Sequence, residues 1–216
     1  MIRFDPLETP EPGDVNSRGT RLGTVASVLA MLLAAPPSRG MELNLRDGQM
    51  LDLWPLRDED SQAGVRKLRT VMAGGPLRVS GEYNALLGPG GCVPKSETAA
   101  TGAEANQGGQ TLAGTYARYG FAQPHLQHLG FGHVANQVGF VGVLATTLAQ
   151  CARENTDLSE HARVFSTFLD DHAGPLCARV VKGIRSEGSS EFYSAVGDLL
   201  VGFLKEAAAL ANHLTD

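Results

Sequence analysis

A glycine-rich loop near the middle of the chain combines residue types that nucleotide-binding proteins and cysteine enzymes use. Residues 88–96 read GPGGCVPKS, with Cys92 after two glycines and with Lys95 and Ser96 at the end. A Walker-type phosphate loop needs the pattern Gly-x-x-x-x-Gly-Lys-Ser/Thr, because its backbone amides cradle the phosphate. Pro94 stands where a glycine should donate its N–H, and proline has none. The pattern therefore favours a turn-rich loop over a phosphate site.

Cys92 could act as a nucleophile only if the fold brought a histidine base and a third, orienting group to it. None of the six histidines lies in a recognisable partner motif. A reactive thiol also needs an electropositive, exposed setting, which the neighbouring sequence does not indicate. We interpret Cys92 as a partly buried, inert cysteine, and a cysteine-dependent enzyme stays as an alternative.

Three histidines, His125, His128 and His133, cluster in the segment PHLQHLGFGH. Two imidazoles three residues apart on a helix could share a metal ion, but metal sites take three or four matched ligands. No carboxylate or cysteine stands nearby, so these histidines are better explained as groups that cap or hydrogen-bond around a helix start. We expect neither a metal nor another cofactor, with a metal-dependent enzyme as the alternative.

The composition argues against several classes of partner. The formal net charge is −5, with 23 acidic against 18 basic residues, whereas nucleic-acid-binding domains usually carry a basic face. We therefore expect no nucleic acid partner. The three cysteines are too few and too widely spaced for a zinc knuckle or a disulfide framework. A reducing compartment, the cytoplasm, is the expected location.

The apolar segments do not indicate export or membrane insertion. The N-terminal stretch MIRFDPLETPEPGD is acidic and contains proline where a signal peptide is basic and then apolar. We expect residues 1–18 to form a disordered lead and residues 19–216 to form one domain. The longest apolar run, residues 24–35, is shorter than the roughly 20 residues that span a bilayer, so we interpret it as a buried helix.

Apolar residues at helical spacing predict a first helix that ends at Pro36-Pro37, followed by shorter helices around residues 65–72 and 79–87. Between them, residues 41–54 alternate apolar and polar side chains around Asp47-Gly48. This alternation locally favours a β-hairpin.

Residues 88–110 contain almost no large apolar side chains, which predicts a long exposed loop of the kind that is often functional. The second half is strongly helical. Its apolar stripes run over residues 134–148, 158–169, 176–184 and 192–214, with Asp157 and Glu160 as a capping box and Pro175 as a separator. No strand and helix units alternate, so we expect an all-α bundle.

Several segments stand in the order that one protein family shows. Glu82-Tyr83, Leu86-Leu87 and Gly88-Pro89 are followed by the loop Pro94-Lys95-Ser96-Glu97-Thr98. They resemble the Glu/Asp-Tyr, Leu-Phe, Gly-Pro and Pro-x-x-Glu-Ser elements of the TorD/DmsD/NarJ family of maturation chaperones for molybdenum-containing redox enzymes. By this resemblance, the glycine-rich loop is a partner-recognition element.

The later segments continue the resemblance. Tyr116 or Tyr119 precedes an apolar helix with His133 at the family's His position, although Gly132 occupies the family's Asp position. The segment FLDDHAGPL is similar to the family's Phe-Leu-x-x-His-Leu-x-x-Trp segment, with Leu176 where tryptophan is usual. Phe192-Tyr193 resembles the terminal Phe-Tyr helix. The resemblance covers about residues 19–214.

The resemblance implies a compact bundle of about ten or more helices and a non-catalytic role. The implied function is a cytoplasmic assembly chaperone that binds the signal peptide or the apo form of a molybdopterin-dependent oxidoreductase subunit, as a monomer or dimer. An acidic protein suits a leader that has an apolar core and a positive end. A structural helical subunit of a redox complex is a further alternative. Partner binding is assigned to Glu82, Tyr83, Leu87, Gly88, Pro89, Pro94, Glu97, Tyr119, His133, Phe140, Asp171 and His172, with Asp170 as a further rim candidate.

Overall fold

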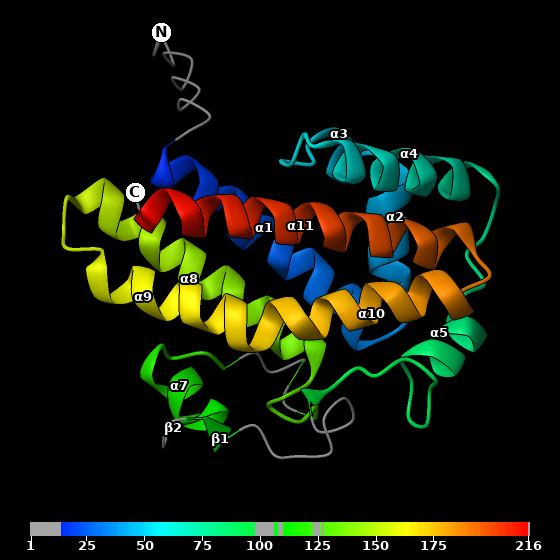
Figure 1. Cartoon of the computed structure of the whole chain (residues 1–216). Helices are drawn as coiled ribbons and strands as arrows, with labels where there is room; N and C mark the ends of the chain where they lie inside the picture. Colours follow the sequence, from blue (N-terminus) through cyan, green and yellow to red (C-terminus); the bar gives the residue numbers. More distant parts are fainter. Residues whose placement is uncertain (1–13, 98–105, 108–109, 123–125, 127, 216) are drawn as a thin grey trace, which may run out of the picture.

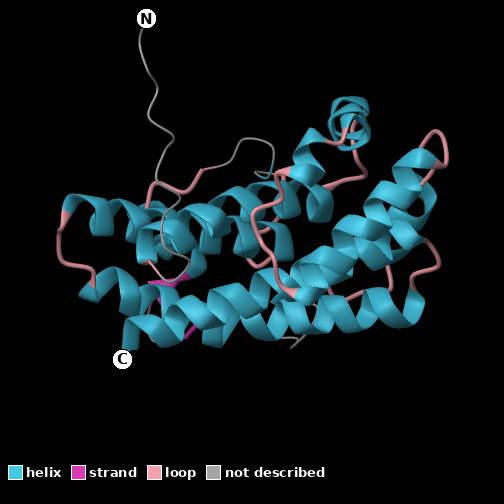
Figure 2. Ribbon diagram, turned by 90° about the horizontal axis from the view of Figure 1, so that it is seen from above, coloured by secondary structure: helices cyan, strands magenta, loops and turns pink. Residues whose placement is uncertain are grey.

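The computed structural model of the protein describes residues 14–97, 106–107, 110–122, 126 and 128–215, and it is a helical bundle (Figure 1). Its elements are α1 (Val15–Ala34), α2 (Arg39–Asp47), α3 (Gln49–Asp52), α4 (Glu59–Ala73), α5 (Ser80–Leu86), β1 (Asn106–Gln107), β2 (Gln110–Thr111), α7 (Leu112–Arg118), α8 (Val134–Glu154), α9 (Ser159–Phe168), η2 (Leu169–Ala173), α10 (Gly174–Glu187) and α11 (Glu191–Thr215). Figure 2 shows that the two strands are only a short ribbon beside long helices. The all-α prediction is therefore confirmed.

The pair α1 and α8 forms the centre of the bundle, and its two backbones approach very closely. A Cβ added to Gly19 would lie 2.3 Å from the Ala145 carbonyl oxygen, and one added to Gly142 would lie 2.4 Å from the Ala26 Cβ. Only small residues permit this distance, because a larger side chain would force the two helix axes apart. These residues, with Gly23, form what we call the α1–α8 glycine seam.

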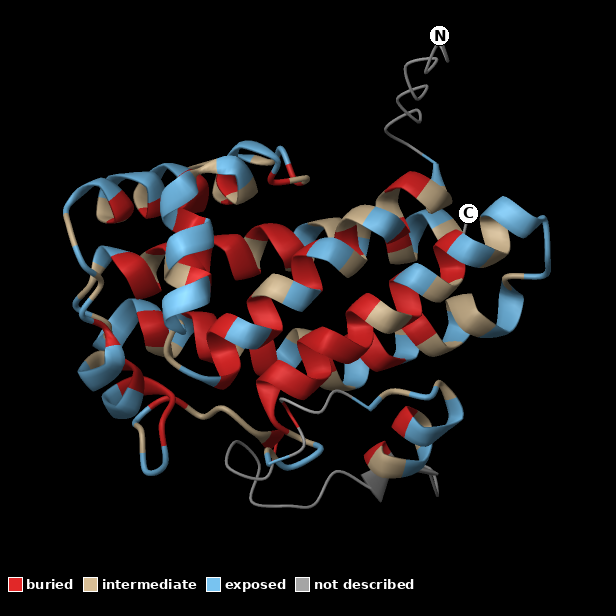
Figure 3. Cartoon of the chain, turned by 180° about the vertical axis from the view of Figure 1, so that it is seen from behind, coloured by how far each residue is buried: buried red, intermediate tan, exposed pale blue. Residues whose placement is uncertain are grey.

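The remaining long helices cover this pair. α11 contacts α1, α4 and α10, and the buried residues follow the sides of the helices that face one another (Figure 3). Gly64 of α4 lies against Leu199 of α11, where an added Cβ would be 2.7 Å from the leucine side chain. The apolar stripes that predicted α1, α8 and α11 are the buried faces of these helices, as amphipathic packing requires.

The prediction of a hairpin over residues 41–54 is wrong, because this segment forms α2 and α3. Ser38 caps α2 by accepting a hydrogen bond from the Met41 N–H at 3.2 Å. Gly48 ends α2 with a positive φ of 84°, so the Asp47-Gly48 pair is a helix C-cap and not a hairpin turn. Met41 and Leu45, four residues apart, are the side chains that α2 buries.

The expected separation at Pro175 is also wrong, because α9, η2 and α10 form one continuous rod (Figure 1). Pro175 lies in the first turn of α10, where a missing N–H is tolerated. The π-helical turn η2 lies immediately before it and absorbs the change in hydrogen-bond register. Asp157 accepts from the Ser159 N–H at 2.9 Å, whereas Glu160 pairs with Arg118, so the predicted capping box does not form.

Two boundaries differ from the sequence-based expectation. α1 already begins at Val15, so residues 15–18 belong to the bundle, and residues 1–13 lie outside the described residues. Of the loop predicted at 88–110, residues 98–105 and 108–109 also lie outside them. Its first part is exposed at Pro89, Gly90 and Cys92, as predicted. It is nevertheless anchored to the bundle, because Val93 is buried and the Cys92 N–H donates to a carbonyl at the end of α5.

Among the described residues, only α8 is long and apolar enough to cross a membrane. However, 72% of its apolar window is buried inside the protein. Its apolar character is explained by its position between α1, α9 and η2, which bury most of its surface. Its exposed polar residues, such as Gln150 and Glu154, lie toward its C-terminal end.

Candidate functional site

The segment that follows the glycine-rich loop docks on the start of α8. The Val134 N–H donates to the Lys95 carbonyl at 2.8 Å, and the Glu97 N–H donates to the Gly132 carbonyl at 3.2 Å. Between these bonds, Ser96 and His133 form an isolated antiparallel bridge. The backbone of residues 95–97 is thereby held against the N-terminal end of the central helix.

This docking buries the carboxylate of Glu97 between two helices. Its Oε1 lies 2.8 Å from His172 Nδ1 on η2 and accepts a hydrogen bond from Gln137 Nε2 on α8 at 2.5 Å. Glu97, Gln137 and His172 come from separate segments of the chain, and we call them the Glu97 network. A buried carboxylate is costly unless hydrogen-bonded groups stabilise it, and this network provides such groups.

His133 caps α8 through its side chain, as the interpretation of the histidine cluster expected. Its Nδ1 accepts a hydrogen bond from the Ala135 N–H at 3.2 Å, which places the proton of the neutral ring on Nε2. Burial, followed by the charges of Lys95 and His128, lowers the pKa of His133 from 6.5 to about 4. The imidazole is therefore neutral at pH 7, and it is only 6% exposed.

An aromatic cluster lies beside the Glu97 network. The Tyr116 ring packs against Phe140 with the ring centroids 4.6 Å apart, and Phe140 packs against Phe168 at 4.8 Å. The Tyr116 hydroxyl donates to the Phe131 carbonyl at 3.0 Å. Burial, and secondly the charge of Glu97, raise the pKa of the Tyr116 hydroxyl, so it stays a donor. The Phe168 ring continues to His172, whose centroid is 5.1 Å away.

A cavity of about 330 Å³ opens next to this cluster. Phe131, which is 57% exposed, forms part of its wall. The cavity combines an aromatic wall with the amide of Asn136, whose Nδ2 donates to the Gly130 carbonyl at 3.0 Å. The lining residues are Tyr116, Phe121, Ala122, Leu126, Leu129, Gly130, Phe131 and Asn136.

Glu82 and Tyr83 form a second cluster, at the other end of α10. Glu82 Oε1 accepts from the backbone N–H groups of Ser189 and Ser190, at 2.7 and 2.9 Å, immediately before α11 begins. The Tyr83 hydroxyl donates to the Ala34 carbonyl at the end of α1 at 2.5 Å, and its ring lies 6.4 Å from the Tyr193 ring. The acidic and aromatic residues of this motif therefore connect the ends of α1 and α11.

Glu82→Ala is expected to lower the free energy of unfolding by about 1 kcal/mol, because two N–H groups before α11 lose their charged acceptor. Glu82→Gln keeps an acceptor oxygen and should lose less. Urea unfolding followed by circular dichroism measures both variants. Equal stability of the wild type and Glu82→Ala would mean that water replaces the carboxylate without cost.

The structure places the predicted site residues in two environments. The buried ones are Tyr83, Leu87, Gly88, Glu97, His133 and Phe140. The exposed or half-exposed ones are Glu82, Pro89, Pro94, Tyr119, Asp170, Asp171 and His172. The first group therefore shapes the site from inside, whereas the second group contains side chains that a partner can touch.

The Glu97 network contains one residue that the sequence analysis missed. Gln137 lies four residues after His133, so both occupy the same face of α8. The only signal for Gln137 in the sequence was a polar residue within a predicted apolar helical stripe. The network joins Glu97 and His172, which were predicted from separate motifs, and places His133 beside them through Ser96.

The residues of the metal and cysteine alternatives lie in different surroundings. In the described ranges, no group of three His, Cys, Asp or Glu side chains is close enough together to hold a metal ion. His128 is exposed whereas His133 is buried, and His125 lies outside the described residues. Cys92 is exposed rather than partly buried, and it lies two residues after Gly90, whose φ is positive at 74°.

The chain gives no significant match to any family model, curated protein or solved structure.

Proposed function

We propose that this protein is a cytoplasmic, non-catalytic assembly chaperone of the TorD/DmsD/NarJ type. It binds the signal peptide or the apo form of a molybdopterin-dependent oxidoreductase subunit and holds it for cofactor insertion before assembly or export. The main support for the proposal is that segments which resemble the family's separate motifs contact one another in the fold. Glu97 of the loop binds His172 of the FLDDH segment, and Tyr83 packs near Tyr193 of the last helix.

The surface around the Glu97 network supports a partner with an apolar part and a positive part. Phe131 is exposed next to Gly132, whose carbonyl accepts from Glu97. Asp170 and Asp171 are exposed on η2, immediately before His172. An apolar residue and two carboxylates that adjoin one network complement a leader peptide with an apolar core and a basic end.

Affinity capture from the native cytoplasm, under the condition that induces the gene, is the direct test. We expect mass spectrometry to find the catalytic subunit of a molybdoenzyme that retains its leader. Asp170→Asn combined with Asp171→Asn should reduce the captured amount several-fold, because the charge attraction is lost. Asp47→Asn is a control that removes one charge elsewhere, since Asp47 is exposed on α2 and far along the chain from this surface.

Capture of no oxidoreductase subunit would contradict the chaperone proposal. Capture of a mature, cofactor-loaded complex would favour the alternative of a structural subunit. Loss of capture in the Asp47→Asn control as well would show that net charge, and not this surface, determines binding.

A further inference from the structure

The end of α1 leaves backbone acceptors without their usual donors. In an α-helix, the N–H groups of residues 36 and 37 would donate to the carbonyls of Leu32 and Leu33, but both positions are proline. The next carbonyl, that of Ala34, accepts from the Tyr83 hydroxyl. Among the described residues, no hydrogen bond reaches the Leu32 or Leu33 carbonyl from outside α1. The α1 C-terminus therefore keeps acceptor capacity and the negative end of a helix dipole.

The start of α2 lies beside this end and has the opposite character. Ser38 caps the Met41 N–H, which leaves the N–H groups of Arg39 and Gly40 without a helical acceptor. The first turn of a helix carries a partial positive charge, and the exposed Arg39 side chain adds a full one. Donors of α2 and acceptors of α1 thus border the same short connection.

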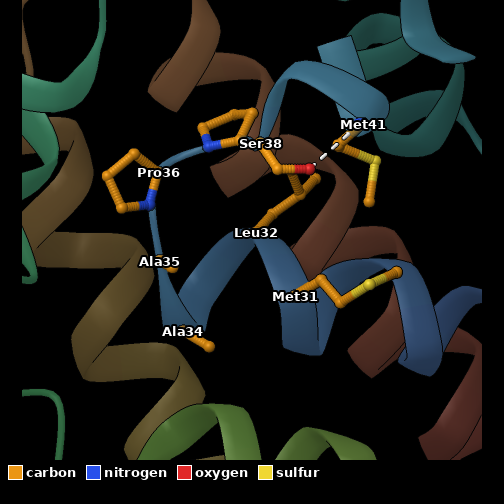
Figure 4. Close-up of a pocket in the computed structure, with 8 residues that line it drawn as sticks. Met31, Leu32, Ala34, Ala35, Pro36, Ser38 and Met41 are labelled. Carbon is orange, nitrogen blue, oxygen red and sulfur yellow. Dashed lines mark hydrogen bonds between the residues drawn. The ribbon is translucent and has the colours of Figure 1, made fainter. Parts of the chain in front are cut away.

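An apolar hollow of about 180 Å³ lies between these two helix ends. Figure 4 shows Met31 on α1 and Met41 on α2, with Ala35 and Pro36 on the chain that joins the helices. Met31 is 38% exposed at the rim of this hollow, so its side chain is accessible from solvent. The residues that line this α1–α2 pocket are Met31, Leu32, Ala34, Ala35, Pro36, Pro37, Ser38 and Met41.

We infer that the α1–α2 pocket holds one aliphatic side chain of an extended peptide segment of the client. The peptide's backbone N–H donates to the open carbonyls of α1, and its carbonyl accepts from the first turn of α2. The inference rests on the proposed function for the source of the peptide, which is a second apolar segment of the client. This segment binds at a surface separate from the Glu97 network.

The charges around the pocket favour a neutral peptide segment. A lysine or arginine side chain would be attracted by the end of α1 but repelled by Arg39 and by the start of α2. A carboxylate or phosphate would be attracted by Arg39 and the start of α2 but repelled by the α1 carbonyls. A neutral peptide group satisfies both ends, because it carries a donor and an acceptor of its own.

The size and the lining of the pocket also favour an aliphatic side chain. A volume of about 180 Å³ is below the 300–1,000 Å³ that is typical of small-molecule sites. It suits a single leucine or methionine side chain. Met31 and Met41 are unbranched and adaptable, so the pocket can accept different apolar residues of a client segment.

Ala35→Phe tests the pocket with little effect on the fold. Ala35 is exposed and extended, with φ −157° and ψ 162°, a conformation that phenylalanine adopts readily. Because Ala35 lines the hollow, we expect the phenylalanine ring to occupy it. The probe is a fluorescein-labelled, C-terminally amidated peptide Ala-Leu-Ala-Ala-Leu-Ala, followed by fluorescence anisotropy. We expect Ala35→Phe to weaken binding at least tenfold, whereas Ala178→Phe, at an exposed position of α10, leaves it unchanged.

Methionine methyl spectra locate the bound peptide. With ¹³C-methyl methionine, the Met31 and Met41 signals should shift as the leucine peptide is added, whereas the signal of the buried Met72 should not. A peptide with both leucines replaced by serine should cause no shift. Undisturbed Met31 and Met41 signals, or equal affinity of wild type and Ala35→Phe, would overturn the inference.

The outcomes for the pocket and for the proposed function are distinguishable. If Ala35→Phe still captures the leader-bearing client at the wild-type level, the pocket inference fails and the chaperone function stands. If the wild type captures no client but Ala35→Phe loses the leucine peptide, the pocket stands as a peptide site and the chaperone function fails.

Discussion

Gly142→Leu is expected to lower the free energy of unfolding by more than about 3 kcal/mol, a large share of the roughly 5–15 kcal/mol of a typical domain. Even a Cβ at this position would lie 2.4 Å from the Ala26 Cβ and 3.6 Å from the Gly23 backbone. Neither neighbour can rotate away, since one is the first side-chain atom and the other is main chain. α1 and α8 would have to separate along the glycine seam. Urea unfolding monitored by circular dichroism measures the loss.

Gly81→Leu is the matched control, because nothing lies within 4 Å of a Cβ at Gly81 in α5. Leucine has a higher helix propensity than glycine, so this variant should be as stable as the wild type or slightly more stable. Similar losses in both variants would mean that the cost arises from replacing glycine and not from the closeness of the helices.

A double-mutant cycle tests the contact itself. Gly142→Ala should destabilise the protein through the Ala26 Cβ, and Ala26→Gly in the same chain removes the atom in conflict. We expect the double variant to lose less free energy of unfolding than the two single variants lose together. If the two losses simply add, the two positions are not in steric conflict.

Acidification from pH 6.5 to about 4 is expected to remove about 3 kcal/mol of stability through His133 alone. Burial lowers the pKa of this imidazole from 6.5 to about 4 in the folded protein. Below pH 6.5 the unfolded chain therefore binds a proton that the folded chain does not accept. The contribution of His133 is complete above pH 6.5, and it is lost as the pH falls toward the folded pKa.

His133→Asn isolates this contribution, because asparagine can cap α8 but does not titrate in this range. The difference in unfolding free energy between pH 7 and pH 4 should become smaller by about 3 kcal/mol in the variant. His213→Asn, at an exposed position near the end of α11, should keep the wild-type difference. An unchanged pH dependence in His133→Asn would show that the ring is hydrated or protonated in the native protein.

In the difference between wild type and variant, the pH-dependent contributions of the other titrating groups cancel. Exposed carboxylates also lose their charge in acid, but they do so in both proteins. Only the term that belongs to position 133 differs between them. Unfolding curves at several pH values between 4 and 7 would locate the window in which that term develops.

The sequence by itself determined the helical class and the long helices. The apolar stripes of α1, α8 and α11 predicted where these helices run, because a repeat of 3.6 residues is a local property of the chain. Residues 41–54 show the limit of the same reasoning. Their alternation suited a hairpin, but Ser38 and Gly48 supply the caps of helices, and burial of Met41 and Leu45 decided the outcome.

The candidate site was predicted only in part. The motifs named Glu97 and His172, but no local pattern indicated that they would bind each other or that Gln137 would join them. The roles of Tyr83 and Phe140 also depended on burial, which placed both of them inside the protein. Burial is a property of the assembled fold, so the sequence could not separate the exposed candidate residues from the buried ones.

Only the tertiary structure decided the contacts between segments far apart in the chain. The glycine seam exists because α1 meets α8, and Gly19 or Gly142 carries no sign of its opposite helix in its own surroundings. The α1–α2 pocket likewise results from two helix ends brought together by Pro36-Pro37. Helix formation depends on neighbours three and four residues away along the chain. Packing depends on segments far apart in the chain, so only the assembled chain determines which helices meet.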